Sequence, residues 1–277
     1  MSGELSITDQ LCFVTARLEC PLNDGTSSVG TGFFFSFVDS QKRTIPVLIT
    51  NRHVVQGSTT GAFVLTESNE DGTPRIGKYT KVILDSFESR WIPHPDPGLD
   101  LCAMPLAPLL NVVRKPFFFR TLDQGLIATP EDMKQLSVLE EVVFVGYPIG
   151  LWDQTNNMPV VRRGVLATLP FLDYEGRKEF LIDAACFPGS SGSPVLLCNV
   201  GPYVARGGGV TISGGVRLKL LGILYAGPRG TDDGRLEVKP IPTATSPVDM
   251  FIHLGNVIKA EVILGFADVL ERVAESD

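Results

Sequence analysis

Short apolar runs separated by glycine- and proline-containing turns recur along the chain, and they fall into two groups. Runs of this kind that are rich in Val, Ile, Phe and Thr are typical of β-strands. The first group begins with Gln10–Glu19 and includes Gly30–Val38, and the second includes Glu141–Val145 and Leu218–Ala226. A connector around residues 105–140 joins the groups. This pattern predicts an all-β fold of paired barrels or a sandwich, in which a cleft between the two units is the natural place for a site.

Two helices are expected outside the strands. Thr129 is suited to an N-cap, Pro130 to the first helical position, and two acids follow in the first turn, so a short helix is predicted over residues 130–136. The second helix is expected over residues 265–274, where apolar side chains recur at helical spacing, namely Phe266, Val269, Leu270 and Val273.

Composition excludes several classes of protein. A net charge of −7 and a pI near 5.1 argue against a general binder of nucleic acid or of anionic membranes. No apolar run approaches the roughly 18 residues of a membrane span, and the N-terminus lacks the basic and apolar regions of a secretory signal. The 5 cysteines are odd in number, without CxxC pairs or cysteine–histidine metal spacing. We therefore expect reduced, mostly buried thiols, no metal site and a cytoplasmic location.

The stretch from Asp183 to Pro194, Asp-Ala-Ala-Cys-Phe-Pro-Gly-Ser-Ser-Gly-Ser-Pro, carries the strongest chemical signal. Gly189 and Gly192 can adopt positive φ and let a substrate approach the backbone closely. Adjacent N–H groups in such a loop can hold a developing oxyanion. Ser191 is the candidate nucleophile, and a serine hydroxyl needs a histidine base with a group that orients it.

His53 and Asp100 are the candidates for these two roles. The chain has 3 histidines, and His53 follows the apolar strand that ends near Thr50, where a base can be held rigidly beside a loop. Asp100 lies between Leu99 and Leu101, and a carboxylate with two apolar neighbours is expected to be at least partly buried. Since burying an unpaired carboxylate is costly, we expect it to have a polar or charged partner. Ser191, His53 and Asp100 together would supply nucleophile, base and orienter.

Three separated segments of the sequence resemble those of chymotrypsin-fold (trypsin-like) serine peptidases, especially bacterial HtrA-type and glutamyl-endopeptidase-like members. They are Leu48–Val55 with His53, Leu99–Met104 with Asp100, and the serine stretch, and they occur in the family's order of His, Asp and Ser. Val145–Gly150 and Leu221–Gly227 also resemble family segments, and the resemblance covers about residues 10–230.

The resemblance implies two packed antiparallel six-stranded β-barrels, followed here by the C-terminal helix. Residues 1–120 would form the barrel that carries His53 and Asp100, and residues 121–277 the barrel that carries Ser191, as one peptidase domain. The residues that it implies for the rest of the site are Gly189, Ser190 and Ser191 for the oxyanion hole, Ala185 and Cys186 near the floor of the primary specificity pocket, and Tyr225, Ala226 and Gly227 as the strand that pairs with a substrate. No acid lies at the pocket floor, which favours small or medium apolar substrate side chains.

The chain departs from the family at several points. Ser190 stands where an Asp or Asn is usual, so the loop is expected to be locked differently, and Ser193 replaces a common Gly. The Ile-Val-Gly-Gly N-terminus of zymogen-activated members is absent, as is any PDZ-like pattern after residue 230. These departures are compatible with a latent peptidase that a protein partner activates.

Other residues compete for the same roles. Asp96, among prolines, is expected to be solvated, and Asp183 to bond backbone near the serine loop. His94 is expected in a surface loop and His253 to pack near the C-terminal segment. Cys186 lies beside the pocket and is interpreted as a buried thiol rather than a nucleophile.

The sequence therefore predicts a serine endopeptidase that uses a Ser-His-Asp triad and an acyl-enzyme, needs no cofactor, and acts on protein or peptide substrates. The alternative is a catalytically silent trypsin-like domain that binds peptides or partner proteins, with Tyr225–Gly227 as its docking edge. No nucleic-acid or membrane partner is expected.

Overall fold

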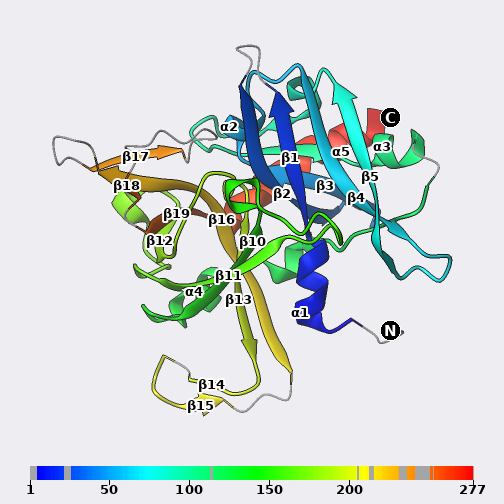
Figure 1. Ribbon diagram of the computed structural model, residues 1–277. Coiled ribbons are helices and arrows are strands. Elements are labelled where there is room, and N and C mark those ends of the chain that lie inside the picture. The colour runs from blue at the N-terminus through cyan, green and yellow to red at the C-terminus, as the bar shows by residue number, and fades with distance from the viewer. Residues whose placement is uncertain are drawn as a thin grey trace.

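The computed structural model describes residues 5–21, 26–112, 115–204, 206–211, 215–230, 236–240, 250–251 and 253–276 (Figure 1). Its strands form two large sheets, one from each half of the chain, which pack against each other. This arrangement confirms the all-β class expected from the two groups of apolar runs. The helices are α1 (Ile7–Gln10), α2 (Arg52–Val55), α3 (Ala107–Val112), α4 (Pro130–Lys134) and α5 (Ala267–Ser276).

The sheet of the N-terminal half pairs its strands in the order β5-β4-β1-β2-β3-β7-β6. These strands are β1 (Thr15–Pro21), β2 (Ser27–Val38), β3 (Thr44–Thr50), β4 (Thr60–Ser68), β5 (Pro74–Asp85), β6 (Ile92–Pro93) and β7 (Cys102–Pro105). Two short strands join its sides, β8 (Phe117–Phe118) on β4 and β9 (Leu122–Asp123) on β2.

In the second sheet six strands follow the order β13-β10-β11-β12-β19-β16. The first and last of them, β13 and β16, also pair with each other, so this sheet closes into a six-stranded barrel. Its strands are β10 (Glu141–Gly146), β11 (Val160–Leu166), β12 (Glu179–Asp183), β13 (Pro194–Val200), β16 (Val216–Gly230) and β19 (Leu254–Lys259). Strands β17 (Leu236–Pro240) and β18 (Met250–Phe251) pair with the far end of β16, and β14 (Tyr203–Val204) forms a separate hairpin with β15 (Val210–Thr211).

One hydrophobic core joins the two halves. Phe33 and Phe35 of β2 pack in the same cluster as Val145 of β10 and Leu196 of β13, while Phe34 on the opposite face of β2 packs inside the N-terminal half. Both faces of β2 are therefore covered, which explains why its aromatic run shows no alternation with polar residues. Burial on this scale fixes the two halves against each other and so fixes the groups along their boundary.

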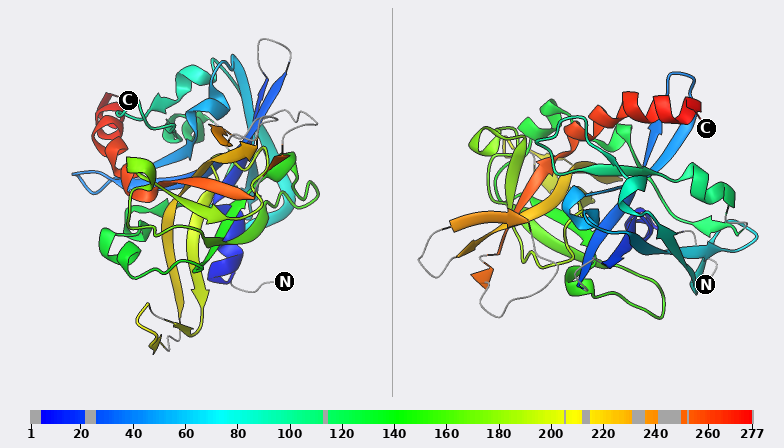
Figure 2. Two further views of the ribbon diagram at one scale, coloured as in Figure 1. Left: turned by 90° about the vertical axis from the view of Figure 1, so that its left-hand side faces the viewer. Right: turned by 90° about the horizontal axis from the view of Figure 1, so that it is seen from above.

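The C-terminal segment crosses from the second half back to the first. A 3₁₀ helix over Ala260–Phe266 leads into α5, which lies against the N-terminal half in both views of Figure 2. Phe266 and Leu270 enter the shared core, and Glu271 accepts hydrogen bonds from the backbone N–H and the hydroxyl of Ser40. The expected C-terminal helix is confirmed, and it ties the two halves together.

Local sequence rules account for the helix ends. Thr129 caps α4 as predicted, and its hydroxyl and the Asp132 carboxylate form a reciprocal capping box. The same motif appears at Ser6 and Asp9, where it forms α1. The strand expected from Gln10 was wrong at its start, because this capped turn and a 3₁₀ turn precede β1, which begins at Thr15.

The 5 cysteines are free thiols. Cys20, Cys102 and Cys186 are buried, and burial raises the pKa of the Cys20 and Cys186 thiols to about 12. No helix within the described part of the chain is long and apolar enough to cross a bilayer.

Candidate active site

His53 and Asp100 meet at the end of β3. After Thr50 the chain turns into the single helical turn α2, which carries His53, and Asp100 lies in the loop two residues before β7. The Nδ1 atom of His53 is 2.5 Å from Oδ2 of Asp100, and the backbone N–H of His53 donates to Oδ1 at 3.0 Å. A carboxylate at Nδ1 holds the ring proton there and leaves Nε2 as the basic nitrogen.

Asn51 steadies the same loop. Its side-chain amide donates to the backbone carbonyl of Asp100 at 2.9 Å, and its side chain is fully buried. The carboxylate of Asp100 and its carbonyl are thus both engaged by the segment that carries His53. A buried hydrogen bond of this kind fixes the loop, because breaking it would leave polar groups without partners.

Ser191 lies in the loop between β12 and β13 and is almost fully buried. Its carbonyl accepts the N–H of Thr31 at 2.8 Å, and the Thr31 carbonyl in turn accepts the hydroxyl of Thr50 at 2.7 Å. Because Thr50 directly precedes Asn51 and α2, this chain of bonds joins the serine loop to the segment that carries His53. The structure thus brings the three residues singled out from the sequence to one boundary between the halves.

The hydroxyl of Ser191 does not bond to His53 in this structure. It donates instead to the carbonyl of Tyr225 at 3.5 Å, while Nε2 of His53 is buried and has no hydrogen-bond partner among the described residues. The serine–histidine contact is often loose in free enzymes and tightens when substrate binds. A rotation about the Cα–Cβ bond of Ser191 is the step that would redirect the hydroxyl.

Two backbone N–H groups of the serine loop, those of Gly189 and Ser191, point away from the carbonyl contacts that hold the loop. The Pro188 carbonyl accepts the Ile149 N–H at 2.5 Å, so the Gly189 N–H, on the opposite side of the same trans peptide, points away from Ile149. The Ser190 carbonyl accepts the Ser193 N–H at 3.1 Å, which turns the Ser191 N–H outward in the same way. Neither N–H has an acceptor within the described chain. Unengaged N–H groups of this kind are available to bind a developing oxyanion.

Ser190 contributes differently from Gly189 and Ser191. Its N–H is engaged with the Phe187 carbonyl at 3.0 Å, and its hydroxyl is buried without a partner in the described residues. The loop is locked instead by Thr31, whose hydroxyl donates to the Gly189 carbonyl at 2.9 Å and accepts the Tyr147 N–H at 3.2 Å. The different locking expected from Ser190 is thus supplied by a threonine of the other half.

Both glycines of the loop are required by close backbone approaches. Gly189 and Gly192 have φ of +86°. A Cβ at Gly189 would lie 2.3 Å from the Tyr147 carbonyl oxygen, and one at Gly192 would lie 1.9 Å from that of Thr31. Only glycine fits these positions.

Ile149 is strained where it holds the loop. It has φ of +53°, a left-handed conformation that β-branched residues rarely adopt, and its N–H is the donor to Pro188. Strain of this kind persists where the surrounding structure demands a particular backbone direction. The sequence analysis missed Asn51, Thr31 and Ile149. Asn51 could have been noticed because it lies two residues before His53, and Thr31 because it lies between two glycines. Ile149 gave no such signal.

The residues expected at the specificity pocket lie beside the loop. Ala185 is half-buried, and Cys186 is buried with its Sγ close to Gly255, where an added Cβ would come within 2.6 Å of the sulfur. With a pKa raised by burial to about 12, the Cys186 thiol is protonated near neutral pH. It is therefore unsuited to act as a nucleophile.

The strand expected to pair with a substrate already has a partner. The carbonyl of Tyr225 faces the Ser191 hydroxyl, but the backbones of Ala226 and Gly227 pair with Pro240 and Lys239 of β17.

The competing residues lie elsewhere. Asp96 accepts the Gly98 N–H within its own loop, and Asp183 is exposed at the end of β12. His94 contacts the Val262 carbonyl through Nε2 at 2.9 Å and packs on Phe266. His253, which was expected to pack near the C-terminal segment, is instead exposed.

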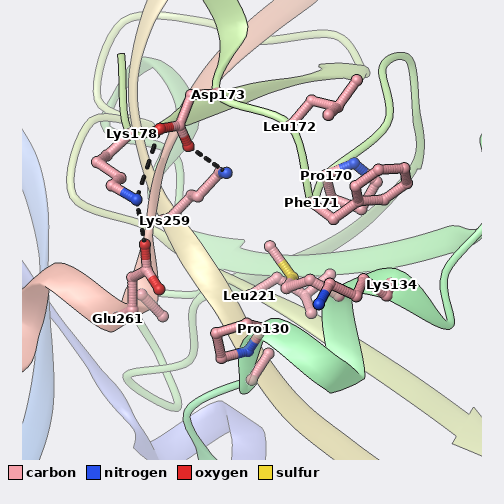
Figure 3. A pocket seen from close by; sticks show the side chains of 13 residues that line it. Pro130, Lys134, Pro170, Phe171, Leu172, Asp173, Lys178, Leu221, Lys259 and Glu261 are labelled. Carbon is pink, nitrogen blue, oxygen red and sulfur yellow. Dashed lines mark hydrogen bonds and ion pairs between the residues drawn. The ribbon is translucent and has the colours of Figure 1, made fainter. Parts of the chain in front are cut away.

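A separate pocket of about 300 Å³ lies between α4 and the ends of β12 and β19 (Figure 3). Its charged groups satisfy one another: Asp173 binds the buried Lys259 at 2.6 Å and Lys178 at 3.5 Å, and Lys178 binds Glu261 at 3.2 Å. None of the three candidate triad residues lines it. We interpret it as a structural ion-pair cluster. No group of metal-binding side chains occurs in the described ranges.

The fold and the boundary between its halves define a chymotrypsin-fold protein, as the sequence resemblance indicated. Residues 30–201 match the family model of the trypsin-like peptidase domain, and the chain belongs to this family. No curated protein matches the chain.

The solved structures to which the chain is similar include proteases. The chain is similar to the HtrA-type protease AlgW with a tripeptide, at 16% identity and a TM-score of 0.48, covering 95% of this chain and 62% of that chain. It is also similar to the serine endoprotease from Yersinia pestis, at 12% identity and a TM-score of 0.46, covering 95% and 64%. For the Rv3671c protease from M. tuberculosis in its active form, the identity is 15%, the TM-score 0.43 and the coverage 92% and 79%. The chain thus spans less than two thirds of the first two proteins.

Proposed function

We propose that this trypsin-like domain is a serine endopeptidase in which Ser191, His53 and Asp100 act as the triad. The observation that carries the proposal is the pair of hydrogen bonds from His53 to Asp100, at 2.5 and 3.0 Å, next to a serine loop with two outward N–H groups. A binding domain has no need of an oriented imidazole beside a buried serine hydroxyl.

The mechanism follows from these positions. Nε2 of His53 takes the proton of Ser191 as the hydroxyl attacks the peptide carbonyl, and Asp100 stabilises the imidazolium. The N–H groups of Gly189 and Ser191 bind the oxyanion of the tetrahedral intermediate. His53 then protonates the leaving amine, and water activated by the same base hydrolyses the acyl-enzyme. These residues supply every acid, base and nucleophile that the reaction requires.

Two residues of the site favour small or medium apolar side chains before the cleaved bond. Cys186 is buried against Gly255, and Ala185 beside it is small. The Tyr225 carbonyl lies where it can accept a hydrogen bond from the substrate backbone, and Gly227 is the next site for strand pairing.

We further propose that the peptidase is latent until a protein partner activates it, and that the protein is cytoplasmic. The unbonded Nε2 of His53 and the strand paired with Ala226 and Gly227 support latency, and the free thiols support a reducing compartment. The unbonded Nε2 and the paired strand also favour the second candidate, a silent domain that binds peptides without cleaving them.

A peptide-library cleavage profile of the wild type against Ser191→Ala separates the two candidates. The endopeptidase predicts cleavage that disappears in Ser191→Ala. Peptide binding that is equal in both proteins, with no cleavage by either, would establish the silent domain instead.

A further inference from the structure

A groove of about 550 Å³ begins at the serine loop. Phe187, two residues before Gly189, forms one wall, and Ile149, whose N–H is bonded to the Pro188 carbonyl, forms another. Trp152 and Leu151 continue the lining away from the loop. The groove is therefore continuous with the backbone that the oxyanion hole uses.

The rim of the groove is unusually apolar for a surface. Ile149 is 66% exposed and Leu151 is 64% exposed, on a short turn whose backbone is strained at Ile149. Large apolar side chains gathered beside a site, and left uncovered, are typical of surfaces that bind a partner.

Arg162 of β11 supplies the positive charge of this groove. Its guanidinium stacks between the rings of Phe144 and Phe187, at 5.0 and 5.2 Å from their centroids. Nη1 is buried and has no hydrogen-bond partner among the described residues, and desolvation lowers the pKa of the guanidinium. The buried Cys186 thiol is the nearby titratable group, and it is uncharged near neutral pH. Arg162 is half-buried, and leaving its buried Nη1 without an acceptor is costly. A carboxylate would satisfy both the charge and this N–H group.

The next residue provides a contrast. Arg163 points to the other face of β11, where its exposed guanidinium pairs with Glu141 at 2.9 Å. Of two neighbouring arginines on one strand, the exposed one has a carboxylate partner and the half-buried one in the groove leaves Nη1 unsatisfied.

We propose that this groove seats the segment of a peptide substrate next to the cleaved bond, and that Arg162 binds the carboxylate of an Asp or Glu side chain in that segment. The inference rests on the proposed peptidase function, to which it adds a preference for acidic substrates. Apolar neighbours of the acidic residue would pack on Phe187, Leu151 and Ile149.

Cleavage of paired peptides that carry Glu or Gln at each position around the scissile bond tests the assignment. Wild type should favour Glu at one position by about tenfold or more, because a charge-assisted hydrogen bond is stronger than a neutral one. Arg162→Met, which keeps an apolar stem between the two rings, should lose the preference while it retains cleavage of the Gln peptide. Arg163→Met is the matched control and should keep the preference.

A binding measurement separates failure of this inference from failure of the peptidase function. In Ser191→Ala protein, the Glu peptide should shift the Trp152 indole resonance more strongly than the Gln peptide, and Arg162→Met should remove the difference. This readout needs no turnover, so it stands even if no cleavage occurs. Equal binding and cleavage of Glu and Gln peptides by wild type, or equal loss in Arg162→Met and Arg163→Met, would overturn the inference.

A second inference comes from the strand register around β16. At Gly222 and Ile223 this strand pairs with β13 on one side and β19 on the other. At Ala226 it pairs with β19 and with β17, so β17 lies on the same edge as β13. Between β13 and β17 on this edge, the Leu224 carbonyl accepts the Gly192 N–H of the serine loop.

We infer that β17 occupies the edge that a substrate strand would use and acts as an internal competitor. The pairing is antiparallel, with Lys239 opposite Gly227 and Pro240 opposite Ala226, so β17 runs along β16 toward Ala226, the end of this pairing nearest Tyr225 (Figure 1). An extended peptide that adds to a sheet edge pairs in the same manner. An intramolecular strand has a high effective concentration and competes strongly with a free peptide. Peptide cleavage would then require displacement of β17, which is where an activating partner would act.

Proline substitutions in β17 test this competition, because proline removes ladder donors. The double variant Glu237→Pro and Lys239→Pro should raise kcat/KM for peptides by at least about fivefold. The rate at which a small fluorophosphonate labels Ser191 should change much less, because this reagent needs no strand edge. Val210→Pro with Thr211→Pro in the β14–β15 hairpin is the control and should change neither. Labelled Ser191 with no gain in peptide cleavage would overturn the inference while leaving the peptidase proposal intact.

Discussion

The two halves of the site differ in how completely their contacts are made. In the N-terminal half, His53 and Asp100 are joined by two hydrogen bonds, and Asn51 holds the Asp100 loop. In the C-terminal half, the serine loop has its two outward N–H groups, but the Ser191 hydroxyl faces Tyr225 and not His53. Each half is organised within itself, and the side-chain link between them is open.

The backbone link between the halves is nevertheless in place. Thr31 of β2 donates its N–H to the Ser191 carbonyl and its hydroxyl to the Gly189 carbonyl. Because the backbones of the two halves are already joined, we expect a side-chain rotation of Ser191, and not a movement of one half against the other, to close the open contact. Rotamer changes are far faster than domain motions, so displacement of whatever excludes the substrate is the expected slow step.

The largest expected effect on hydrolysis comes from breaking the contact inside the N-terminal half. Asp100→Asn should lower kcat by roughly 10⁴-fold, because an amide at this position favours the wrong tautomer of His53. Asp96→Asn, a few residues earlier in an exposed loop, is the control and should leave kcat within twofold. Steady-state kinetics on one peptide measures both, and similar losses in the two variants would contradict the assignment of Asp100.

A smaller effect is expected from loosening the serine loop. Thr31→Val removes the hydroxyl that bridges the Gly189 carbonyl and the Tyr147 N–H, and should lower kcat by about 10- to 100-fold with little change in KM. Leaving two buried polar groups unpaired should also reduce the free energy of unfolding by about 1–3 kcal/mol. Thr31→Ser keeps the hydroxyl and should retain most of the wild-type kcat and most of the wild-type free energy of unfolding. If Thr31→Ser is as impaired as Thr31→Val, the methyl group and not the hydrogen bonds would explain the loss.

The ion-pair cluster of Figure 3 should affect stability without affecting the chemistry. Asp173→Asn leaves the buried Lys259 without its carboxylate and should destabilise the fold by about 2–3 kcal/mol, with kcat unchanged at a temperature where the protein stays folded. The hydrogen bond from Lys259 lowers the pKa of Asp173, so its stabilisation is present above the carboxyl's ordinary pKa and disappears as the pH falls through the lowered value. Denaturant titrations at pH 7 and pH 3 measure this, and the difference in stability between the two proteins should narrow in acid. A lower kcat in the folded variant would connect the cluster to the active site.

The smallest expected effect concerns the ionisation of Cys186, which should matter only in alkali. Burial raises its pKa to about 12 in the folded protein, so its contribution to stability is complete below the unfolded thiol's pKa near 9 and is lost as the pH rises toward 12. Cys186→Ala should therefore show a shallower fall of Tm between pH 9 and pH 11, with kcat at pH 7 within a few-fold of wild type. A loss of nearly all activity at pH 7 would restore the thiol as a candidate nucleophile.

Much of the fold and the candidate triad follow from local sequence patterns. Apolar strand runs, the cap at Thr129 and the glycines around Ser191 each impose structure over a few residues, so they can be recognised without coordinates. The segment before Thr15 was misread because Gln10 and Cys12 fit a strand pattern, while the deciding contact is the capping box of Ser6 with Asp9. Local competition between a cap and a strand cannot be settled by apolar content alone.

The contacts that lock and flank the site depend on long-range geometry. Thr31 and Gly189 are 158 residues apart, and nothing in the sequence couples them. Arg162 and Arg163 are equivalent in the sequence, and only their faces on β11 separate the half-buried one from the paired one. The placement of β17 on the same edge as β13 is likewise a property of strand register, which apolar patterns do not specify.

Fluorophosphonate labelling followed by peptide mapping tests the central claim most directly, because it asks whether Ser191 is an activated nucleophile without requiring any particular substrate. We predict a single adduct on Ser191 in the wild type that is lost in Ser191→Ala and in His53→Ala, and retained in Asp96→Asn. Absence of label from the folded wild type and from the variant with prolines in β17 would contradict the account, as would an adduct that persists in His53→Ala.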